Sequence, residues 1–283
     1  MTRTRLASES WTRFTAFVPE MRRPGFAGFW LTLVVATGMG LVLAGVELGQ
    51  RLAWGALLWQ AILVGGLVLG AYCGFWRHRQ SYRARYGDEA YRRLFFRFVS
   101  PTAALIVASA WTPLAGTQGP RLPDALAWCL VVYLLATAAL IAARGRELFW
   151  NLDLRAFVYS VFPDRGIWVA SPLFDRLRHP IYSAAVRSIL AVALLRNNVE
   201  AIACALLVCL AFRVWAAVED AEMIERYPAY EDYRRAVPAL AVVRPGRWAE
   251  FMWFLLLGSE FSKPAAVRRA TATPTPVDAA GSR

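Results

Sequence analysis

The sequence is nearly without lysine and is poor in charge of either sign. Only 18% of its 283 residues are charged, and Lys263 is the single lysine among 32 basic residues. A soluble domain carries about 25% charged residues, so this composition is unusual for one. Hydrophobic residues make up 58% of the chain instead, and they occur in long blocks. These features exclude a disordered chain, a secreted disulfide scaffold and a soluble enzyme with one signal peptide, and they predict a polytopic membrane protein.

Cysteine motifs are also lacking, and we expect no cleaved leader segment. The four cysteines lie inside apolar blocks without CxxC spacing, so we expect small buried side chains, with no disulfide and no metal site. The N-terminus carries charge but no adjoining apolar core, which argues against a cleaved signal peptide. The net charge of +12 suits arginine-rich loops that face anionic membrane lipids. A nucleic-acid partner is not expected, because such a protein would be less apolar.

Six apolar blocks predict an all-α fold, a polytopic bundle of about six transmembrane helices. The blocks cover residues 25–48, 54–76, 94–114, 125–143, 181–195 and 199–217. The fifth block is short, and the tight turn at 196–198 makes it an antiparallel hairpin with the sixth. In the second block, Gly66, Gly70 and Gly74 recur every four residues and predict a flat face for close helix packing.

The distribution of arginine predicts the orientation in the membrane. The N-terminus, the segments 77–100 and 144–178, and the C-terminal region hold most of the arginines, whereas each intervening loop holds one. The positive-inside rule therefore places both termini in the cytoplasm, and the bias to arginine suggests a bacterial inner membrane.

We divide the chain into five parts by composition. They are a cytoplasmic N-terminal segment, four N-terminal spans, a core that holds the helical hairpin, an interfacial segment and a disordered tail. Their ranges are 1–24, 25–143, 144–249, 250–263 and 264–283. Within the interfacial segment, the apolar patch Phe251 to Gly258 is too short to span the bilayer.

The first candidate for chemistry is an Arg-His-Pro sequence where the long polar stretch meets the fifth span. Proline at a helix start leaves the preceding backbone extended, so Arg178 and His179 are presented at the mouth of the bundle by Pro180. The free N–H groups of the helix start favour an anion there. A plain helix start with a snorkelling arginine is the alternative.

The second candidate is an acidic pair directly after the sixth span. Because the hairpin is antiparallel, Glu219 and Asp220 return beside the Arg-His-Pro sequence. One site would then hold cationic and helix-end donors on one side and carboxylates on the other. Tyr227, Tyr230 and Tyr233 recur every three residues and are suited to form aromatic walls. Ordinary salt bridges on a membrane-edge helix remain an alternative for the acids.

Two further arginines lie within the hairpin spans. A charge at the centre of a span costs about 2.5–3.5 kcal/mol on insertion scales, so Arg187 is expected to face the bundle interior or a wet cavity. It would there hold an anionic substrate group or pair with another side chain. Arg213 lies seven residues before Asp220 and so on the same helix face. Both are candidate substrate-binding residues.

Together, these elements resemble the membrane-embedded methyltransferases. The resemblance covers about residues 165–240 and rests on Arg178-His179-Pro180-x-Tyr182, a helical hairpin, an acidic pair and a Tyr-x-x-Tyr-x-x-x-Val-Pro ending. The family includes isoprenylcysteine carboxyl methyltransferases and phospholipid methyltransferases.

The sequence departs from the family pattern at several positions. Asp220 replaces the usual second glutamate, Met223 replaces leucine, and Tyr227-Pro228 stands where Phe-Gly is usual. One residue is missing before the first motif tyrosine, and Ala239 replaces the arginine that commonly follows Val-Pro.

The resemblance implies an S-adenosylmethionine-dependent methyltransferase with a cytoplasmic cofactor pocket and a lipid or small hydrophobic acceptor. It implies catalytic roles for Arg178 and Glu219. The cofactor-binding residues that it implies are Arg178, His179, Pro180, Tyr182, Glu219, Asp220, Tyr230 and Tyr233. The cofactor's carboxylate suits an arginine, its ammonium and ribose suit carboxylates, and its sulfonium suits tyrosine faces.

Two other functions remain open at this point. An NADPH-dependent membrane reductase would share a related C-terminal arrangement but needs a larger pocket. A non-enzymatic transporter or assembly protein would place charges and helix breakers near the midplane of several spans. The acceptor of a methyltransferase stays unidentified, and Arg187 favours one with an anionic group.

Overall fold

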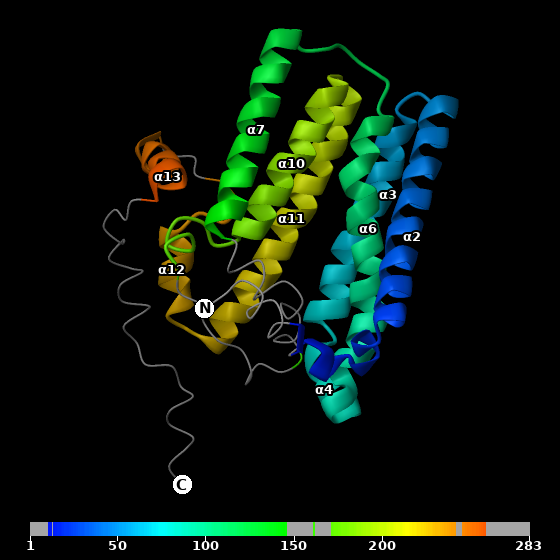
Figure 1. Ribbon diagram of the computed structural model, residues 1–283, viewed down its shortest axis with the longest axis vertical. Helices are drawn as coiled ribbons and strands as arrows, with labels where there is room; N and C mark the ends of the chain where they lie inside the picture. The colour runs from blue at the N-terminus through cyan, green and yellow to red at the C-terminus, as the bar shows by residue number, and fades with distance from the viewer. Residues whose placement is uncertain (1–10, 13, 146–160, 162–170, 242–244, 259–283) are drawn as a thin grey trace.

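The computed structural model describes residues 11–12, 14–145, 161, 171–241 and 245–258, which form helices and turns without a strand (Figure 1). The prediction of an all-α fold is confirmed. The helices that build the bundle are α2 (Pro24–Arg51), α3 (Gly55–Leu69), α6 (Ser100–Trp111), α7 (Asp124–Arg144), α10 (Pro180–Arg196) and α11 (Val199–Arg226). The shorter elements are η1 (Pro19–Arg22), η2 (Gly70–Trp76), α4 (Arg79–Tyr86), η3 (Gly87–Glu89), α5 (Ala90–Leu94), η4 (Phe95–Val99), η5 (Thr112–Ala115), α12 (Tyr230–Ala236) and α13 (Pro245–Leu257). The tail predicted at 264–283 and most of the polar segment 144–178 lie outside the described residues.

Five stretches of the described chain are long and apolar enough to cross a membrane. They are Pro24–Arg51, Gly55–Gly74, Arg79–Ala115, Asp124–Arg144 and Val199–Arg226. Helix α10 has 17 residues, which gives a length of about 26 Å against a hydrocarbon core of about 30 Å. It packs mainly against α7 and α11. A sixth span formed by α10 therefore stays a prediction.

The predicted hairpin of α10 and α11 is confirmed, and two asparagines make its turn. Asn197 ends α10 with a left-handed φ of 52°, a conformation that asparagine tolerates better than most residues. The side chain of Asn198 accepts a hydrogen bond of 2.9 Å from the backbone N–H of Ala201 and so caps α11. Because only these two residues separate the helices, the chain returns directly beside itself.

The predicted glycine face packs against the helix that runs through η4 and α6. A Cβ atom on Gly66 would lie 3.3 Å from Leu105, and one on Gly74 would lie 2.6 Å from the ring of Phe98. At Gly70 the nearest atom is the Thr102 hydroxyl, at 3.5 Å. The glycines thus let two helices approach at a distance that larger side chains would prevent.

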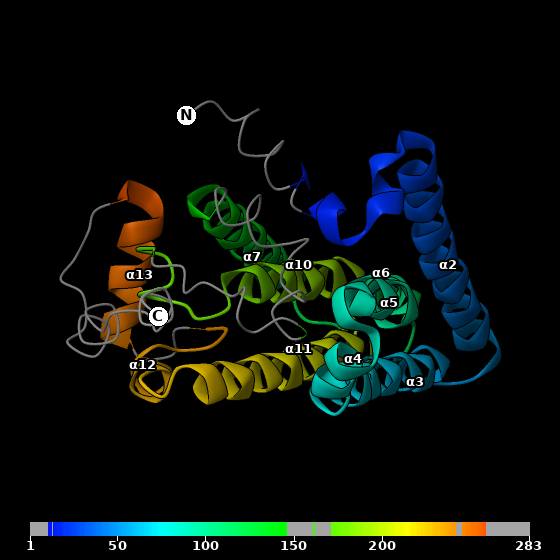
Figure 2. The same cartoon turned by 90° about the horizontal axis from the view of Figure 1, so that it is seen from below.

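The charged connections of the described chain gather at one end of the bundle. We call this the lower end, after its place in Figure 1, where α4 and α12 lie. Helices α7 and α11 end there, and α10 begins there. The single arginines of the intervening loops, at positions 51, 121 and 196, lie at the upper end. Seen from below in Figure 2, α11 runs between α12 and α4. This arrangement is the one that the orientation prediction requires.

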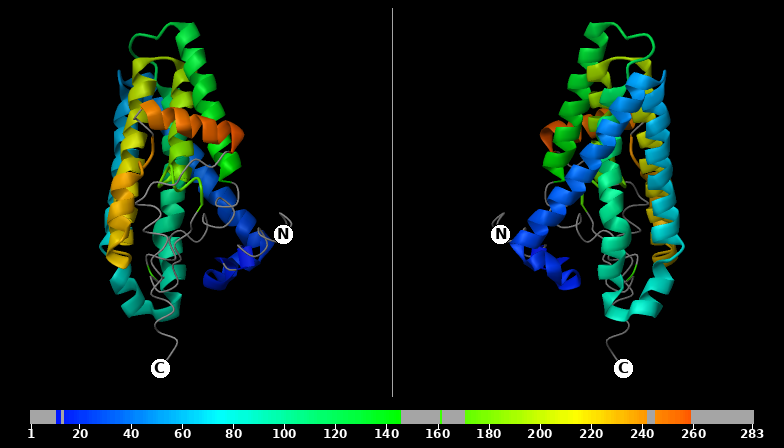
Figure 3. Two further views of the ribbon diagram at one scale, coloured as in Figure 1. Left: turned by 90° about the vertical axis from the view of Figure 1, so that its left-hand side faces the viewer. Right: turned by 90° about the vertical axis from the view of Figure 1, so that its right-hand side faces the viewer.

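Helix α13 lies across the bundle instead of along it (Figure 3). It has 13 residues and begins before the apolar patch predicted at 251–258. Phe251, Phe254 and Leu255 are buried against α7 and the start of α10. Arg144 at the end of α7 donates hydrogen bonds of 3.0 Å to the carbonyl oxygens of Leu255 and Leu256. At about 20 Å, the helix is too short to span the bilayer, as predicted.

Candidate active site

The start of α10 and the chain after α12 are joined at the lower end. Pro180 is the first residue of α10, and His179 before it has an extended φ of −124°. The N–H groups of Arg178 and His179 lie outside the helix, and they donate hydrogen bonds to the segment Val237–Leu240. The N–H of Arg178 lies 3.0 Å from the carbonyl oxygen of Pro238, and the N–H of His179 lies 3.1 Å from that of Ala239. The Val-Pro ending is thus a support for the Arg-His-Pro sequence.

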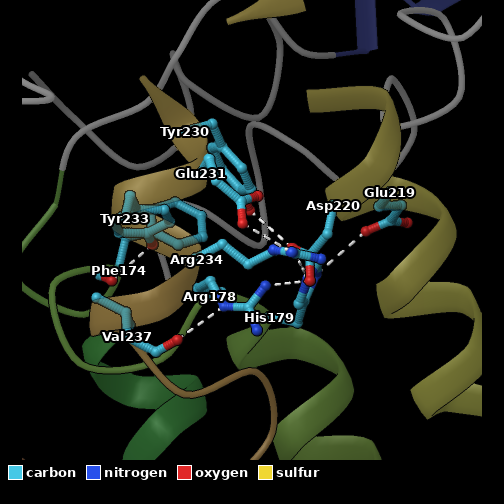
Figure 4. Close-up of polar contacts among 10 residues, drawn as sticks. All are labelled: Phe174, Arg178, His179, Glu219, Asp220, Tyr230, Glu231, Tyr233, Arg234 and Val237. Carbon is cyan, nitrogen blue, oxygen red and sulfur yellow. Dashed lines mark hydrogen bonds and ion pairs between the residues drawn. The ribbon is translucent and has the colours of Figure 1, made fainter. Parts of the chain in front are cut away.

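Asp220 is the centre of the polar contacts at this end (Figure 4). It is 2% exposed, near the end of α11. Its carboxylate forms an ion pair with Arg178, accepts a hydrogen bond of 2.9 Å from the hydroxyl of Tyr230, and lies 3.0 Å from Nε2 of His179. Arg178 also donates a 2.8 Å bond from Nε to the carbonyl oxygen of Val237. A buried charge is tolerated only with such partners, so these residues hold one another in place.

Glu219 differs from its neighbour because its side chain is 35% exposed. Its carboxylate lies 3.2 Å from Nδ1 of His179 and accepts a hydrogen bond from the hydroxyl of Tyr182. The rings of His179 and Tyr182 are parallel within 8°, with centroids 5.6 Å apart. We call the following set the acid–arginine network: Arg178, His179, Tyr182, Glu219, Asp220 and Tyr230.

Asp220 and Glu219 favour the protonated, positively charged form of His179. Burial of the His179 ring opposes protonation, but the hydrogen bonds and negative charges of Asp220 and Glu219 outweigh burial and raise its pKa to about 9. Burial raises the pKa of the Tyr230 and Tyr233 hydroxyls well above their usual value. At neutral pH, the network therefore holds a protonated histidine and neutral tyrosines.

Tyr233 packs against the network through the ring of Tyr230. Its hydroxyl donates to the carbonyl oxygen of Phe174 at 2.7 Å, and its ring centroid lies 5.1 Å from that of Tyr230. Arg187, one helical turn beyond Ser183, bonds to Ser183 and to the carbonyl oxygen of Leu240. It is half-buried, adjacent to the network but outside it.

Arg213 lies outside the acid–arginine network, and its role as a substrate-binding residue stays a prediction. Arg213 is exposed and continues an outward-facing stripe of α11 that includes Leu206 and Leu210, each 56% exposed. Asp220 lies on the same side of the helix, but there Arg178, His179 and α12 cover it. Arg213 lies two helical turns earlier, and no described residue covers it in the same way.

A pocket of about 430 Å³ lies between α4 and the last turns of α11, a feature that the sequence did not reveal. Its lining residues are Arg79, Gln80, Arg83, Ala84, Val161, Glu222, Glu225 and Arg226. Glu222 follows Glu219 by three residues, so both lie on one face of α11. Arg79 is 9% exposed, stacks on the Trp76 ring at 4.0 Å and bonds to Glu225 at 2.5 Å. The pocket therefore joins cationic and acidic groups close to the network.

A buried carboxylate oxygen of the pocket has no hydrogen bond from the described residues. Oε1 of Glu222 is buried and accepts no hydrogen bond from the described residues, although Arg226 lies 3.2 Å away as an ion pair. Buried carboxylate oxygens are normally hydrogen-bonded, so this oxygen is available to a ligand donor.

The fold and this end of the bundle define a helical integral-membrane protein with a charged site where its spans end. Residues 126–230 match the family model described as phospholipid methyltransferase, so this part of the chain is similar to that family of membrane methyltransferases. The match runs from the first turn of α7 to the first residue of α12 and covers the whole acid–arginine network. A search of curated proteins finds no match, and neither does a search of solved structures.

Proposed function

We propose that the protein is an integral membrane methyltransferase that uses S-adenosylmethionine and methylates a lipid or small hydrophobic acceptor. The observation that carries this proposal is the acid–arginine network, because it joins the two halves of the methyltransferase motif across the α10–α11 hairpin. The network lies within the segment that matches the phospholipid methyltransferase family. We also propose that the lower end faces the cytoplasm, since the described arginine-rich connections gather there.

The side chains at the lower end suit this cofactor. S-adenosylmethionine ends in an amino acid, which carries an ammonium and a carboxylate. The pocket beside α4 offers partners for both, and the buried oxygen of Glu222 lacks a hydrogen bond from the described residues. Its volume of about 430 Å³ is in the range of small-molecule sites. We therefore assign the amino-acid end of the cofactor to this pocket, with Glu222 as an acceptor for the ammonium.

The two motif acids have different tasks in this proposal. Asp220 and Arg178 are buried and satisfied by each other, so they are positioning residues that fix the entrance of α10 against α11. Glu219 keeps part of its carboxylate exposed and touches both rings of the His179–Tyr182 stack. We assign Glu219, His179 and Tyr182 to direct contact with the cofactor. Tyr230 and Tyr233 support them from behind.

The cofactor supplies an electrophilic methyl group bound to sulfur. The chain supplies position and electrostatics, since a displacement reaction gains most from alignment of the two reactants. Tyrosine faces attract a sulfonium charge, and the exposed oxygen of Glu219 favours it. Because the lower end adjoins the membrane-spanning bundle, a hydrophobic acceptor reaches it from the bilayer and the polar cofactor reaches it from water.

Binding of the cofactor tests the proposal. Detergent-purified protein is titrated calorimetrically with S-adenosylmethionine, and separately with NADPH. We expect S-adenosylmethionine to bind, and we expect His179→Ala and Glu219→Ala to weaken binding at least tenfold. Glu47→Ala is the matched control, because Glu47 is an exposed acid near the upper end of α2. Binding of NADPH without S-adenosylmethionine would instead support a reductase.

A further inference from the structure

Arg187 brings a positive charge into the bundle between α10 and its neighbours. It lies in the third turn of α10 and is half-buried. Its hydrogen bonds within the described chain all leave from Nη1. They reach the carbonyl oxygen of Ser183 at 3.0 Å, the hydroxyl of Ser183, and the carbonyl oxygen of Leu240 at 3.3 Å. The guanidinium is therefore drawn back toward the lower end.

This arginine has more donors than it has partners among the described residues. A guanidinium has five N–H groups, and Nη1 carries only two of them. Nε and Nη2 make no hydrogen bond to the described residues, and neither is among the buried atoms that lack one. No carboxylate of the described chain forms an ion pair with Arg187, unlike Arg178 with Asp220. A charge within a predicted span is retained where it faces an anion or a wet cavity, and the unused donors of Arg187 suit an anion from outside the described chain.

Helix α7 packs along α10, and α13 is joined to α7 by a side-chain hydrogen bond. Tyr133 of α7 interacts electrostatically with Arg187. Its hydroxyl also accepts a hydrogen bond of 3.0 Å from the indole of Trp248, in α13. Both aromatic side chains are partly exposed, at 37% and 43%. The hydroxyl of Tyr133 thus links the indole of Trp248 to the electrostatic surroundings of Arg187.

The place of this site relative to the acid–arginine network limits what it binds. Nη1 of Arg187 is held at the level of Ser183, and the Ser183 N–H bonds to the carbonyl of His179 one helical turn away. One turn of helix rises about 5 Å, so the guanidinium is a few bond lengths deeper in the bundle than the network. A ligand that contacts both Arg187 and the acid–arginine network would carry its reacting group and an anionic group only a few atoms apart.

We propose that Arg187 is the specificity-determining residue for the acceptor, and that it holds a phosphate or carboxylate of a membrane-soluble molecule. The inference rests on the proposed methyltransferase function and adds the chemical class of its acceptor. The anionic group lies on the bundle side, and the atom to be methylated lies toward Glu219 and the cofactor pocket. Tyr133 and Trp248 line the path of the apolar part.

Three probes with the same oleoyl chain test this inference. Purified protein is titrated with oleoyl lysophosphatidate, oleate and monooleoylglycerol, and bound probe is counted by native mass spectrometry. We expect at least one anionic probe to bind about tenfold or more tightly than the neutral probe, the size of a charge-assisted contact. The preferred anion identifies phosphate or carboxylate as the group bound. This comparison uses the unaltered protein and so depends on no variant.

Variants assign the preference to the residue. Arg187→Gln is expected to remove the preference for the anion, and Arg187→Lys to keep part of it. Arg121→Gln is the control of equal charge, because Arg121 is exposed in the loop before α7. Equal binding of all three probes, or an undiminished preference in Arg187→Gln, overturns the inference. S-adenosylmethionine binding is measured on the same samples, so failure of the proposed function is detected separately.

Discussion

Replacing Asp220 with asparagine separates the positioning acid from the contact acid. The substitution keeps the shape of the side chain but removes its charge. Arg178 and the protonated His179 then stay buried without that counter-charge. Removing one partner of a buried ion pair costs about 3–5 kcal/mol. At about 2–4 °C of melting temperature for each kcal/mol, Asp220→Asn should melt about 10 °C below the unaltered protein.

The matched comparison is Glu219→Gln, one residue earlier in the chain. Since the Glu219 side chain is 35% exposed, its loss should lower the melting temperature by only a few degrees. Both variants are melted in detergent by tryptophan fluorescence, and S-adenosylmethionine affinity is measured beside each melt. Tyr230→Phe is a milder variant that removes only the 2.9 Å bond to Asp220. A smaller loss of stability in Asp220→Asn than in Glu219→Gln would refute the division of tasks.

Three further predictions concern the fold. The pKa of His179 is raised from 6.5 to about 9, so its positive charge stabilises the folded state fully below pH 6.5. This contribution of up to about 3 kcal/mol is lost as the pH rises through about 9. Melting temperatures measured at several pH values should show the loss in the unaltered protein and not in His179→Gln. Gly74→Ala should destabilise the protein by about 1–3 kcal/mol, because its Cβ atom meets Phe98 at 2.6 Å, whereas Gly65→Ala meets nothing within 4 Å and should be neutral in the same melt. Glu200→Ala should lower the melting temperature, because this fully buried carboxylate accepts backbone hydrogen bonds of 2.8 and 3.0 Å at the upper end. It should leave S-adenosylmethionine affinity unchanged, and a change in affinity would argue against the assignment of the cofactor site to the lower end.

The hairpin was predictable because the determinants of its turn are local. Asn197 and Asn198 end one helix and begin the next, and an antiparallel return follows from so short a connection. That geometry is enough to bring Asp220 beside Arg178. The glycine face was predictable for the same reason, since spacing along one helix determines which residues share a face.

The parts that were missed depend on contacts between distant segments. The pocket joins Glu222 to Arg79, and nothing near either residue in the sequence indicates the other. The support that Pro238 gives to Arg178 depends on how the chain folds back after α12. Helix periodicity correctly placed Arg213 on the side of Asp220. It could not show that α12, Arg178 and His179 cover Asp220 and leave Arg213 exposed.

Transfer of a labelled methyl group tests the central claim most directly. Purified protein in lipid vesicles is incubated with S-adenosylmethionine that carries a tritiated methyl group, and the organic phase is counted. The proposed function predicts label in an extractable lipid or hydrophobic product. It also predicts loss of that label in Glu219→Gln, with the label retained in Glu47→Gln. Label that stays in the aqueous phase with every lipid extract supplied, or equal transfer by Glu219→Gln, would contradict a methyltransferase site at this network.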